Sequence, residues 1–72
     1  MKLDLHGVKH SEVSHQVDSF IWDAIQRNMY EVEIITGNSI EMKNIVRECV
    51  NDYGFNCAQA YLNSGTLIVA LV

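Results

Sequence analysis

An aspartate and a histidine stand two residues apart near the start of the chain, as Asp4 and His6. They alternate with Leu3 and Leu5, and Gly7 follows directly. In an extended strand, residues i and i+2 share a face, so Asp4 and His6 are predicted to point one way and the two leucines the other. A carboxylate beside an imidazole can transfer protons or hold a metal ion, and strand ends are where open α/β sheets bind ligands.

The same two residues also have a purely structural explanation. Polar groups between leucines are what any half-exposed strand shows, with Asp4 capping a nearby backbone group and His6 in a turn. Taken alone, this explanation is favoured. A metal site made of His6, His10 and His15 is disfavoured, because the spacing is poor and His15 lies on the polar side of a predicted helix. A divalent cation held by Asp4 together with phosphate oxygens of a ligand fits the sequence better.

A second candidate region follows the next predicted strand. Residues 31–36 are rich in β-branched side chains and end at Gly37, whose lack of a side chain allows close approach of a ligand to the backbone. Asn38 with Glu41 three residues later resembles a capping box, which predicts that a helix begins there. Free N–H groups and the helix dipole would make this junction a phosphate site, although any strand–glycine–helix junction looks similar.

Charge is segregated along this second helix. Lys43 and Arg47 are predicted to lie on one flank, and Glu41, Glu48 and Asp52 on the opposite flank. Lys43 stands near the first turns, where the dipole disfavours a cation, and a bound anion would remove that conflict. An ordinary solvated helix with segregated charges explains the pattern slightly better.

The length and the amino-acid composition indicate one globular domain over residues 1–72, and the net charge is −4. That charge argues against coating nucleic acid through bulk electrostatics, but it allows a small local basic site. The longest apolar run, residues 67–72, is far too short to span a membrane, and we expect a cytoplasmic protein without a secretory signal. Cys49 and Cys57 fit no zinc pattern, and both fall on predicted core faces, so buried reduced thiols are expected.

Hydrophobic periodicity and turn residues predict the element order βαβαββ. The expected strands and helices are 2–6, about 10–28, 31–36, a helix from about residue 39 that ends at Gly54, 55–62 and 66–72, with a turn at 63–65. Strands separated by a single helix are expected to pair in parallel, and the last two to form an antiparallel hairpin. The predicted fold class is α/β, an α+β two-layer sandwich with a four-stranded mixed sheet and two helices on one face.

Two apolar features lie outside this plan. The last strand is apolar on both faces, which favours a central strand over a dimer contact, although the sequence does not decide between them. Trp22 lies off the centre of the apolar stripe of the first helix. A tryptophan folded over the core edge is the favoured interpretation, and a partner or dimer patch is the alternative.

Taken together, these residues resemble the Smr (small MutS-related) domain over nearly the whole chain. The family motif LDLHG is intact at residues 3–7. The family's TGxG motif corresponds to residues 36–39, with Ser39 in place of the second glycine, and its Leu-Arg pair corresponds to Val46-Arg47. Residues 11–13 stand where the family has an acidic pair and an alanine, and a tight turn replaces the family's glycine-rich loop before the last strand.

The resemblance implies a fold like the C-terminal domain of translation initiation factor 3 and binding to RNA or DNA, with nicking or endonucleolytic cleavage in several members. The family's motif residues map to Asp4 and His6 as catalytic residues, and Asp4 is also the expected ligand of Mg²⁺ or Mn²⁺. The expected nucleic-acid-binding residues are Gly7, Lys9, His10, Thr36, Gly37, Asn38, Ser39, Lys43 and Arg47.

Three functions follow as hypotheses. The first is an endonuclease that cleaves phosphodiester bonds in RNA or DNA. The second is a module that binds nucleic acid or the ribosome without catalysis, which Ser39 and the acidic net charge favour. The third is a protein-interaction adaptor or weak homodimer that uses Trp22 or the last strand. A monomer is equally compatible with the sequence, and no contact with a membrane is expected.

Overall fold

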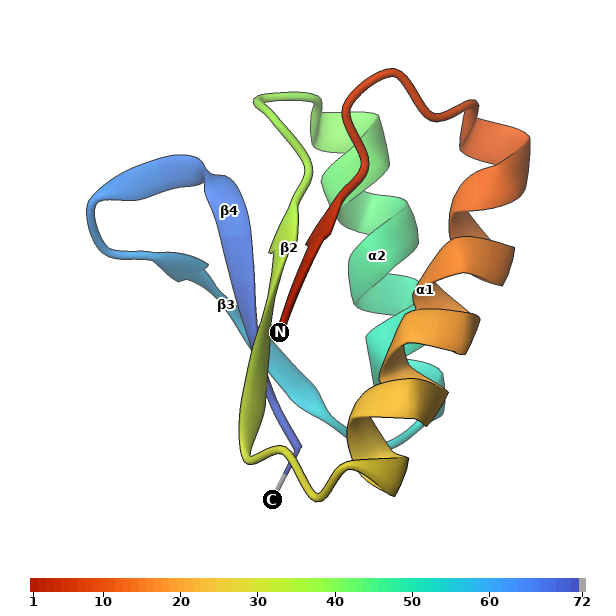
Figure 1. Ribbon diagram of the computed structural model, residues 1–72. Coiled ribbons are helices and arrows are strands. Elements are labelled where there is room, and N and C mark those ends of the chain that lie inside the picture. The colour runs from red at the N-terminus through yellow and green to blue at the C-terminus, as the bar shows by residue number, and fades with distance from the viewer. Residues whose placement is uncertain (72) are drawn as a thin grey trace.

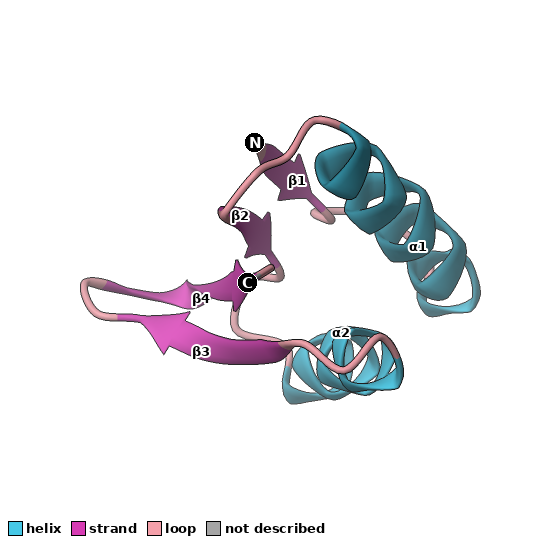
Figure 2. Ribbon diagram, turned by 90° about the horizontal axis from the view of Figure 1, so that it is seen from below, coloured by secondary structure: helices cyan, strands magenta, loops and turns pink. Residues whose placement is uncertain are grey.

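The computed structural model describes residues 1–71 and confirms the βαβαββ order. The elements are β1 (Lys2–Asp4), α1 (His10–Gln26), β2 (Glu31–Ile35), α2 (Ile40–Asp52), β3 (Asn56–Ala60) and β4 (Asn63–Ala70). Both helices cover one face of the four-stranded sheet and leave the other face open (Figures 1 and 2). This is the predicted two-layer arrangement. The last residue of the expected fourth strand, Val72, lies outside the described residues.

A single apolar core fills the space between the two layers. Both helices form because their apolar residues recur at helical spacing and can be buried on one side. The fully or nearly fully buried side chains are Leu5, Val13, Val17, Ile21, Ala24, Val32, Ile34, Met42, Val46, Val50, Leu67 and Val69. Leu3 and Leu5 both pack with this core, which leaves the intervening Asp4 exposed, as the alternation in the sequence predicts.

The strand order is β1-β2-β4-β3, so the last strand lies inside the sheet. β1 pairs with β2 in parallel, as expected across a single helix, and β4 pairs antiparallel with both β2 and β3. The expectation that β2 and β3 pair with each other is wrong, because β4 takes the place between them. The central position of β4 confirms the favoured interpretation. Leu67 and Val69 are buried under the helices, whereas Ile68 and Ala70 face the open side of the sheet, where they are half-buried and exposed.

The hairpin between β3 and β4 turns earlier than predicted. Its two-residue loop is Tyr61-Leu62, whereas the expected turn at 63–65 is the beginning of β4. The register also shifts between Gln59, which pairs with Leu67, and Ala60, which pairs with Asn63. Ser64, Gly65 and Thr66 therefore have no register partner on β3, and this bulge leaves their backbone groups free for other contacts.

Both helices begin at the same end of the molecule because β1 and β2 are parallel and each leads directly into a helix (Figure 1). We call the surface made by residues 5–10, 36–41 and 63–65 the loop end. Its three segments come from distant parts of the chain. The opposite surface, around the end of α1, is called the far end.

The far end is more apolar than the sequence predicts. Trp22 is 61% exposed, so the expectation that it folds over the core edge is wrong. A shallow pocket of about 240 Å³ lies nearby and is lined by Ile25, Asn28, Met29, Tyr30 and Leu71. Within residues 1–71, no helix has both the length and the hydropathy needed to cross a membrane.

Polar contacts also join the two helices along their length. Tyr53 Oη donates to Asp18 Oδ1 at 3.3 Å, and Cys49 Sγ lies 3.4 Å from Ser14 Oγ. Partial removal from water and the Asp18 carboxylate raise the pKa of Tyr53 above its ordinary value of 10.0. Cys49 and Cys57 are free thiols, as expected, but both are only half-buried.

Candidate nucleic-acid interface

The first part of the loop end is the turn that follows β1. Val8 N–H donates to Leu5 O at 3.0 Å, and Gly7 has φ +78°, which is the positive φ that the third position of a type II turn requires. Asp4 Oδ1 accepts from the backbone N–H of His6 at 2.8 Å. The Asp4 carboxylate therefore holds the turn that carries the imidazole, while the His6 side chain stays exposed.

Asp4 and His6 both belong to the turn after β1, but no hydrogen bond between their side chains occurs within residues 1–71. The backbone-capping role considered for Asp4 is therefore present. The described part of the chain has no group of three or more His, Cys, Asp or Glu placed to hold a metal ion, at Asp4 or elsewhere.

The second part of the loop end follows β2 and is held firmly. Thr36 is only 5% exposed, and its Oγ1 donates to Gly37 O at 2.9 Å and lies 3.3 Å from Gly65 O. The backbone N–H groups of Thr36 and Gly37 both donate to Gly65 O, at 2.8 and 3.0 Å. The Thr36 hydroxyl is thus turned inward, and the loop offers its backbone and Asn38 to the surface. Gly37 has a φ of +68°, which glycine adopts at little cost because it has no side chain.

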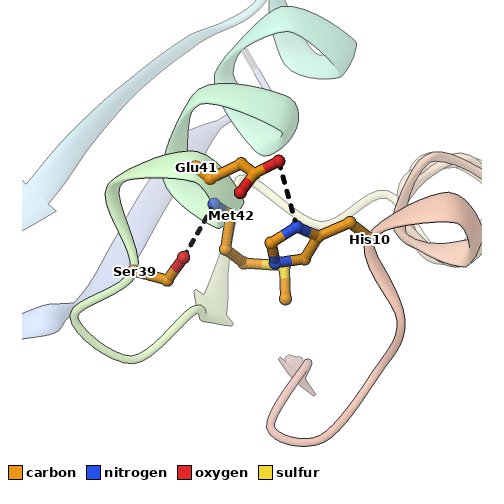
Figure 3. Close-up of polar contacts among 4 residues, drawn as sticks. All are labelled: His10, Ser39, Glu41 and Met42. Carbon is orange, nitrogen blue, oxygen red and sulfur yellow. Dashed lines mark hydrogen bonds and ion pairs between the residues drawn. The ribbon is translucent and has the colours of Figure 1, made fainter.

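Ser39, rather than Asn38, caps α2. Ser39 Oγ accepts from Met42 N–H at 3.1 Å, as drawn in Figure 3. Asn38 instead accepts from Ser64 Oγ at 3.0 Å, which ties the loop to the start of β4. The expected capping box between Asn38 and Glu41 is therefore wrong, because the N-cap is Ser39, one residue later. The residue that replaces the family's second glycine has a specific local role, because serine is among the strongest N-caps.

The start of α1 is capped differently. Its N-cap residue, Lys9, makes no side-chain cap, whereas His10 Nδ1 lies 3.3 Å from Glu41 Oε1 on α2 (Figure 3). When His10 is protonated this contact is an ion pair that joins the two helix starts. Among the described residues, the N–H groups of His10 and Ser11 on α1 have no hydrogen-bond partner. Those of Ile40 and Glu41 on α2 are equally free, so both helices present donors and positive dipole ends here.

The cations of the chain are unevenly distributed. Lys2 pairs with Glu33 at 3.6 Å, and Arg27 pairs with Asp23 at 3.2 Å. The remaining three cations form no ion pair within residues 1–71, and they are Lys9, Lys43 and Arg47. Lys9 belongs to the loop end, Lys43 lies in the first turns of α2, and Arg47 lies one turn further along the same helix. Two of the three unpaired cations, Lys9 and Lys43, therefore stand near the free N–H groups of the helix starts.

The two loops lie side by side, but their side chains do not form one compact pocket. Leu5 N–H donates to Ile35 O at 2.9 Å, so the ends of β1 and β2 are adjacent. Asp4 lies on the open face of the sheet, while Lys43 and Arg47 belong to the helix layer. On α2 these two cations point away from α1, because Cys49, which faces Ser14, lies on the opposite flank. A ligand that contacts both groups must cross the end of the sheet.

Three of these contacts could not be inferred from the sequence. The His10–Glu41 contact, the Ser64–Asn38 bond and the Thr36–Gly65 contact each join segments that are far apart along the chain. The only local signal is the run of small and polar residues at 63–65, a composition that predicts a turn. Its short side chains are what allow the second loop to lie against β4.

This chain is similar in sequence to a known protein family. A family model described as the Smr domain matches residues 3–71. No curated protein and no solved structure matched. At the family level, this match marks a nucleic-acid-binding, nuclease-like domain. The match includes the turn with Asp4 and His6, the Thr36–Ser39 loop and all three free cations. The chain, which the match covers almost from end to end, therefore belongs to the Smr domain family.

Proposed function

We propose that this domain binds the backbone of RNA or DNA at the loop end and hydrolyses a phosphodiester bond there. The observation that carries the proposal is that two helix starts with free N–H groups, Lys9 and the exposed His6 lie at the loop end, while, among the described residues, Lys43 and Arg47 stand unpaired on α2. Phosphate oxygens are suitable acceptors for helix N-terminal N–H groups, and Lys and Arg add charge without further rearrangement.

In this proposal, Lys9, Lys43 and Arg47 hold phosphates, and His6 transfers a proton to or from the reacting oxygen. Histidine suits this task because its imidazole accepts and donates protons near neutral pH. Asp4 fixes the position of His6 through the bond between its Oδ1 and the His6 N–H. Its other carboxylate oxygen is a candidate ligand for Mg²⁺ or Mn²⁺, and further ligands would come from phosphate and water.

Cleavage of labelled RNA and DNA, each single- and double-stranded, with and without Mg²⁺ or Mn²⁺, tests the proposal. We expect His6→Ala to lower the cleavage rate by about 10²–10⁴-fold, which is the usual contribution of a general acid or base, with unchanged binding. His15→Ala is the matched control, because His15 is an exposed histidine on α1 outside the loop end. Cleavage that is identical in the parent and in His6→Ala would remove His6 from the mechanism.

Substitutions at Asp4 separate its two proposed roles. Asp4→Asn keeps an oxygen that can accept from the His6 N–H but removes the negative charge, and Asp4→Ala removes both. If Asp4 only positions the turn, Asp4→Asn stays active and Asp4→Ala does not. If the charge is needed, both variants lose cleavage, and the loss in Asp4→Asn shows that a cation or a proton transfer depends on the carboxylate.

Binding without catalysis is the second candidate, and a specific observation favours it. Asp4 is already used by the backbone of its own turn, and no side-chain hydrogen bond joins it to His6 among the described residues. In that case nucleic acid, free or in the ribosome, binds and no product forms. With three cations, the logarithm of single-strand affinity should fall with the logarithm of salt concentration with a slope of about 2. Lys43→Glu with Arg47→Glu should flatten that slope in either case.

A further inference from the structure

The loop between β3 and β4 exposes two large apolar side chains. Tyr61 is 97% exposed and Leu62 is 91% exposed. Two-residue hairpin loops favour glycine, asparagine and aspartate, because these residues adopt the required backbone conformations at low cost. Neither side chain belongs to the core. Neither turn formation nor core packing therefore explains a tyrosine at position 61 in the described part of the chain.

The hairpin is tied directly to the candidate nucleic-acid interface. Ser64 Oγ donates to Asn38, and Gly65 O accepts from two N–H groups of the loop before α2. A Cβ added at Gly65 would lie 3.2 Å from the Gly37 Cα, so the two backbones are already in close contact. Tyr61 stands three residues before Ser64 on the projecting hairpin, visible at the left of Figure 1. Its position is thus fixed relative to the loop end.

Charge alone gives this domain little affinity for a polynucleotide. Three unpaired cations stand against a net charge of −4 on the chain. Proteins that bind single strands combine a cationic track for the backbone with exposed aromatic rings on which bases stack, and each stacked base contributes appreciably. A duplex hides its base faces inside the helix stack, so only unpaired nucleotides can use such a ring.

We infer that Tyr61 is a base-stacking residue and that the ligand of the loop end is a single strand or an unpaired segment of nucleic acid. This inference rests on the proposed binding function and adds the class of ligand to it. The phosphates lie along the loop end and the start of α2, and a neighbouring base leaves its own stack to lie on the Tyr61 ring. Leu62 extends the apolar surface beside that ring.

Fluorescence anisotropy with a labelled oligonucleotide tests the inference. The probes are one mixed sequence as single-stranded RNA, as single-stranded DNA and as a blunt duplex of each. Tyr61→Ala should weaken single-strand affinity by roughly 5- to 150-fold, which corresponds to one stacked base, and should leave duplex affinity unchanged. Tyr61→Phe should stay within about twofold of the parent, because the ring is kept.

Tyr30→Ala is the matched control, since Tyr30 is also an exposed tyrosine but lies at the far end. A parent that binds single strands while Tyr61→Ala binds them equally well overturns the inference and leaves the proposed function intact. An equal loss for duplex and single strand also overturns it. A parent that binds none of the four probes removes the proposed function and this inference together. An unchanged thermal melting curve for Tyr61→Ala would show that the variant is folded.

Discussion

The two loops that lead from a strand into a helix follow the same plan but are held in different ways. Each has a glycine with positive φ, Gly7 in the first loop and Gly37 in the second. The second loop is locked by the buried Thr36, by contacts with Gly65 and by the Ser39 cap. The first loop is held mainly by short-range bonds, and its helix has no side-chain cap.

This difference assigns separate tasks to the two loops. The second loop is held rigidly and fixes the start of α2, where the free N–H groups of Ile40 and Glu41 suit the binding of a phosphate. The first loop carries the exposed Asp4 and His6 and has fewer long-range contacts, so it can adjust when a ligand arrives. Within residues 1–71, its one side-chain hydrogen bond or ion pair to the rest of the loop end is the His10–Glu41 contact. The predictions that follow test this contrast.

The largest effect on stability is expected at the contact between the second loop and β4. Gly65→Val places a side chain 3.2–3.3 Å from the Gly37 backbone, which cannot move away without breaking the bonds to Gly65 O. We expect a loss of about 2–3 kcal/mol in the free energy of unfolding, measured by chemical denaturation. Ala70→Val, at an exposed position of the same strand, is the control. Equal stability of the two variants would show that the loop is not locked.

Alanine at each positive-φ glycine compares the two loops directly. Gly37→Ala should cost about 1–2 kcal/mol, because a left-handed conformation is strained for an L-residue and the surrounding contacts keep it in place. Gly7→Ala should cost less, because its turn can change conformation with the loss of only local bonds. Both added Cβ atoms have open space around them, so the comparison reports backbone strain. Equal costs would contradict the contrast.

The helix caps provide a reciprocal test. Ser39→Ala removes the acceptor for Met42 N–H and should destabilise the protein by about 1 kcal/mol. Lys9→Ser introduces a cap where α1 has none and should stabilise by about 0.5–1 kcal/mol, while it weakens nucleic-acid binding through the loss of a cation. Thermal melting measures both changes. A destabilising Lys9→Ser would mean that the start of α1 is held by contacts other than a cap.

A smaller effect is expected for the contact that joins the two helix starts. The His10 and Glu41 side chains are both exposed, so their coupling energy should be about 0.2–1 kcal/mol and should fall with added salt. A double-mutant cycle with His10→Ala and Glu41→Ala isolates this term from the effect of each residue on its own helix. Zero coupling at low salt would leave the first loop without a side-chain link to α2.

The smallest effect lies outside the loop end, at the Tyr53–Asp18 contact. The raised pKa of Tyr53 means that the folded protein holds the phenol proton more tightly than the unfolded chain does. Its stabilising contribution is fully present below pH 10 and is lost as the pH rises through the folded pKa. The parent should therefore lose stability above pH 10 relative to Tyr53→Phe, measured by denaturation at each pH. Parallel pH profiles would exclude this contribution.

The sequence predicts most of the fold, because the apolar spacing in α1 and α2 and the alternation around Leu3 and Leu5 reflect local burial. The choice of strand partners is a long-range property, and no local pattern shows that β4 lies between β2 and β3. The sequence predicts the turn at 63–65 because these residues are typical of turns, whereas the actual loop, Tyr61-Leu62, has none of the usual turn residues. The small side chains of residues 63–65 allow contact with the second loop.

The candidate site was predicted only in part. The motif residues identify the two loops, and the structure brings those loops together through the bond from Leu5 N–H to Ile35 O. The burial of Thr36 and the pairing of His10 depend on contacts with distant segments, so neither could be inferred from nearby residues. The sequence also could not show that Lys9 forms no ion pair within residues 1–71, because ion pairing depends on which acidic residues lie near it in space.

The central place of β4 also has a consequence for synthesis of the chain. Residues 1–60 can form both helices early, but β2 lacks its second neighbour until residues 63–70 have left the ribosome. Pairing across such a sequence separation is slow compared with helix formation. Gly65 O arrives in the same late step, so the Thr36–Asn38 segment acquires its final geometry only then. A nascent chain is therefore expected to remain inactive towards nucleic acid until its last strand is in place.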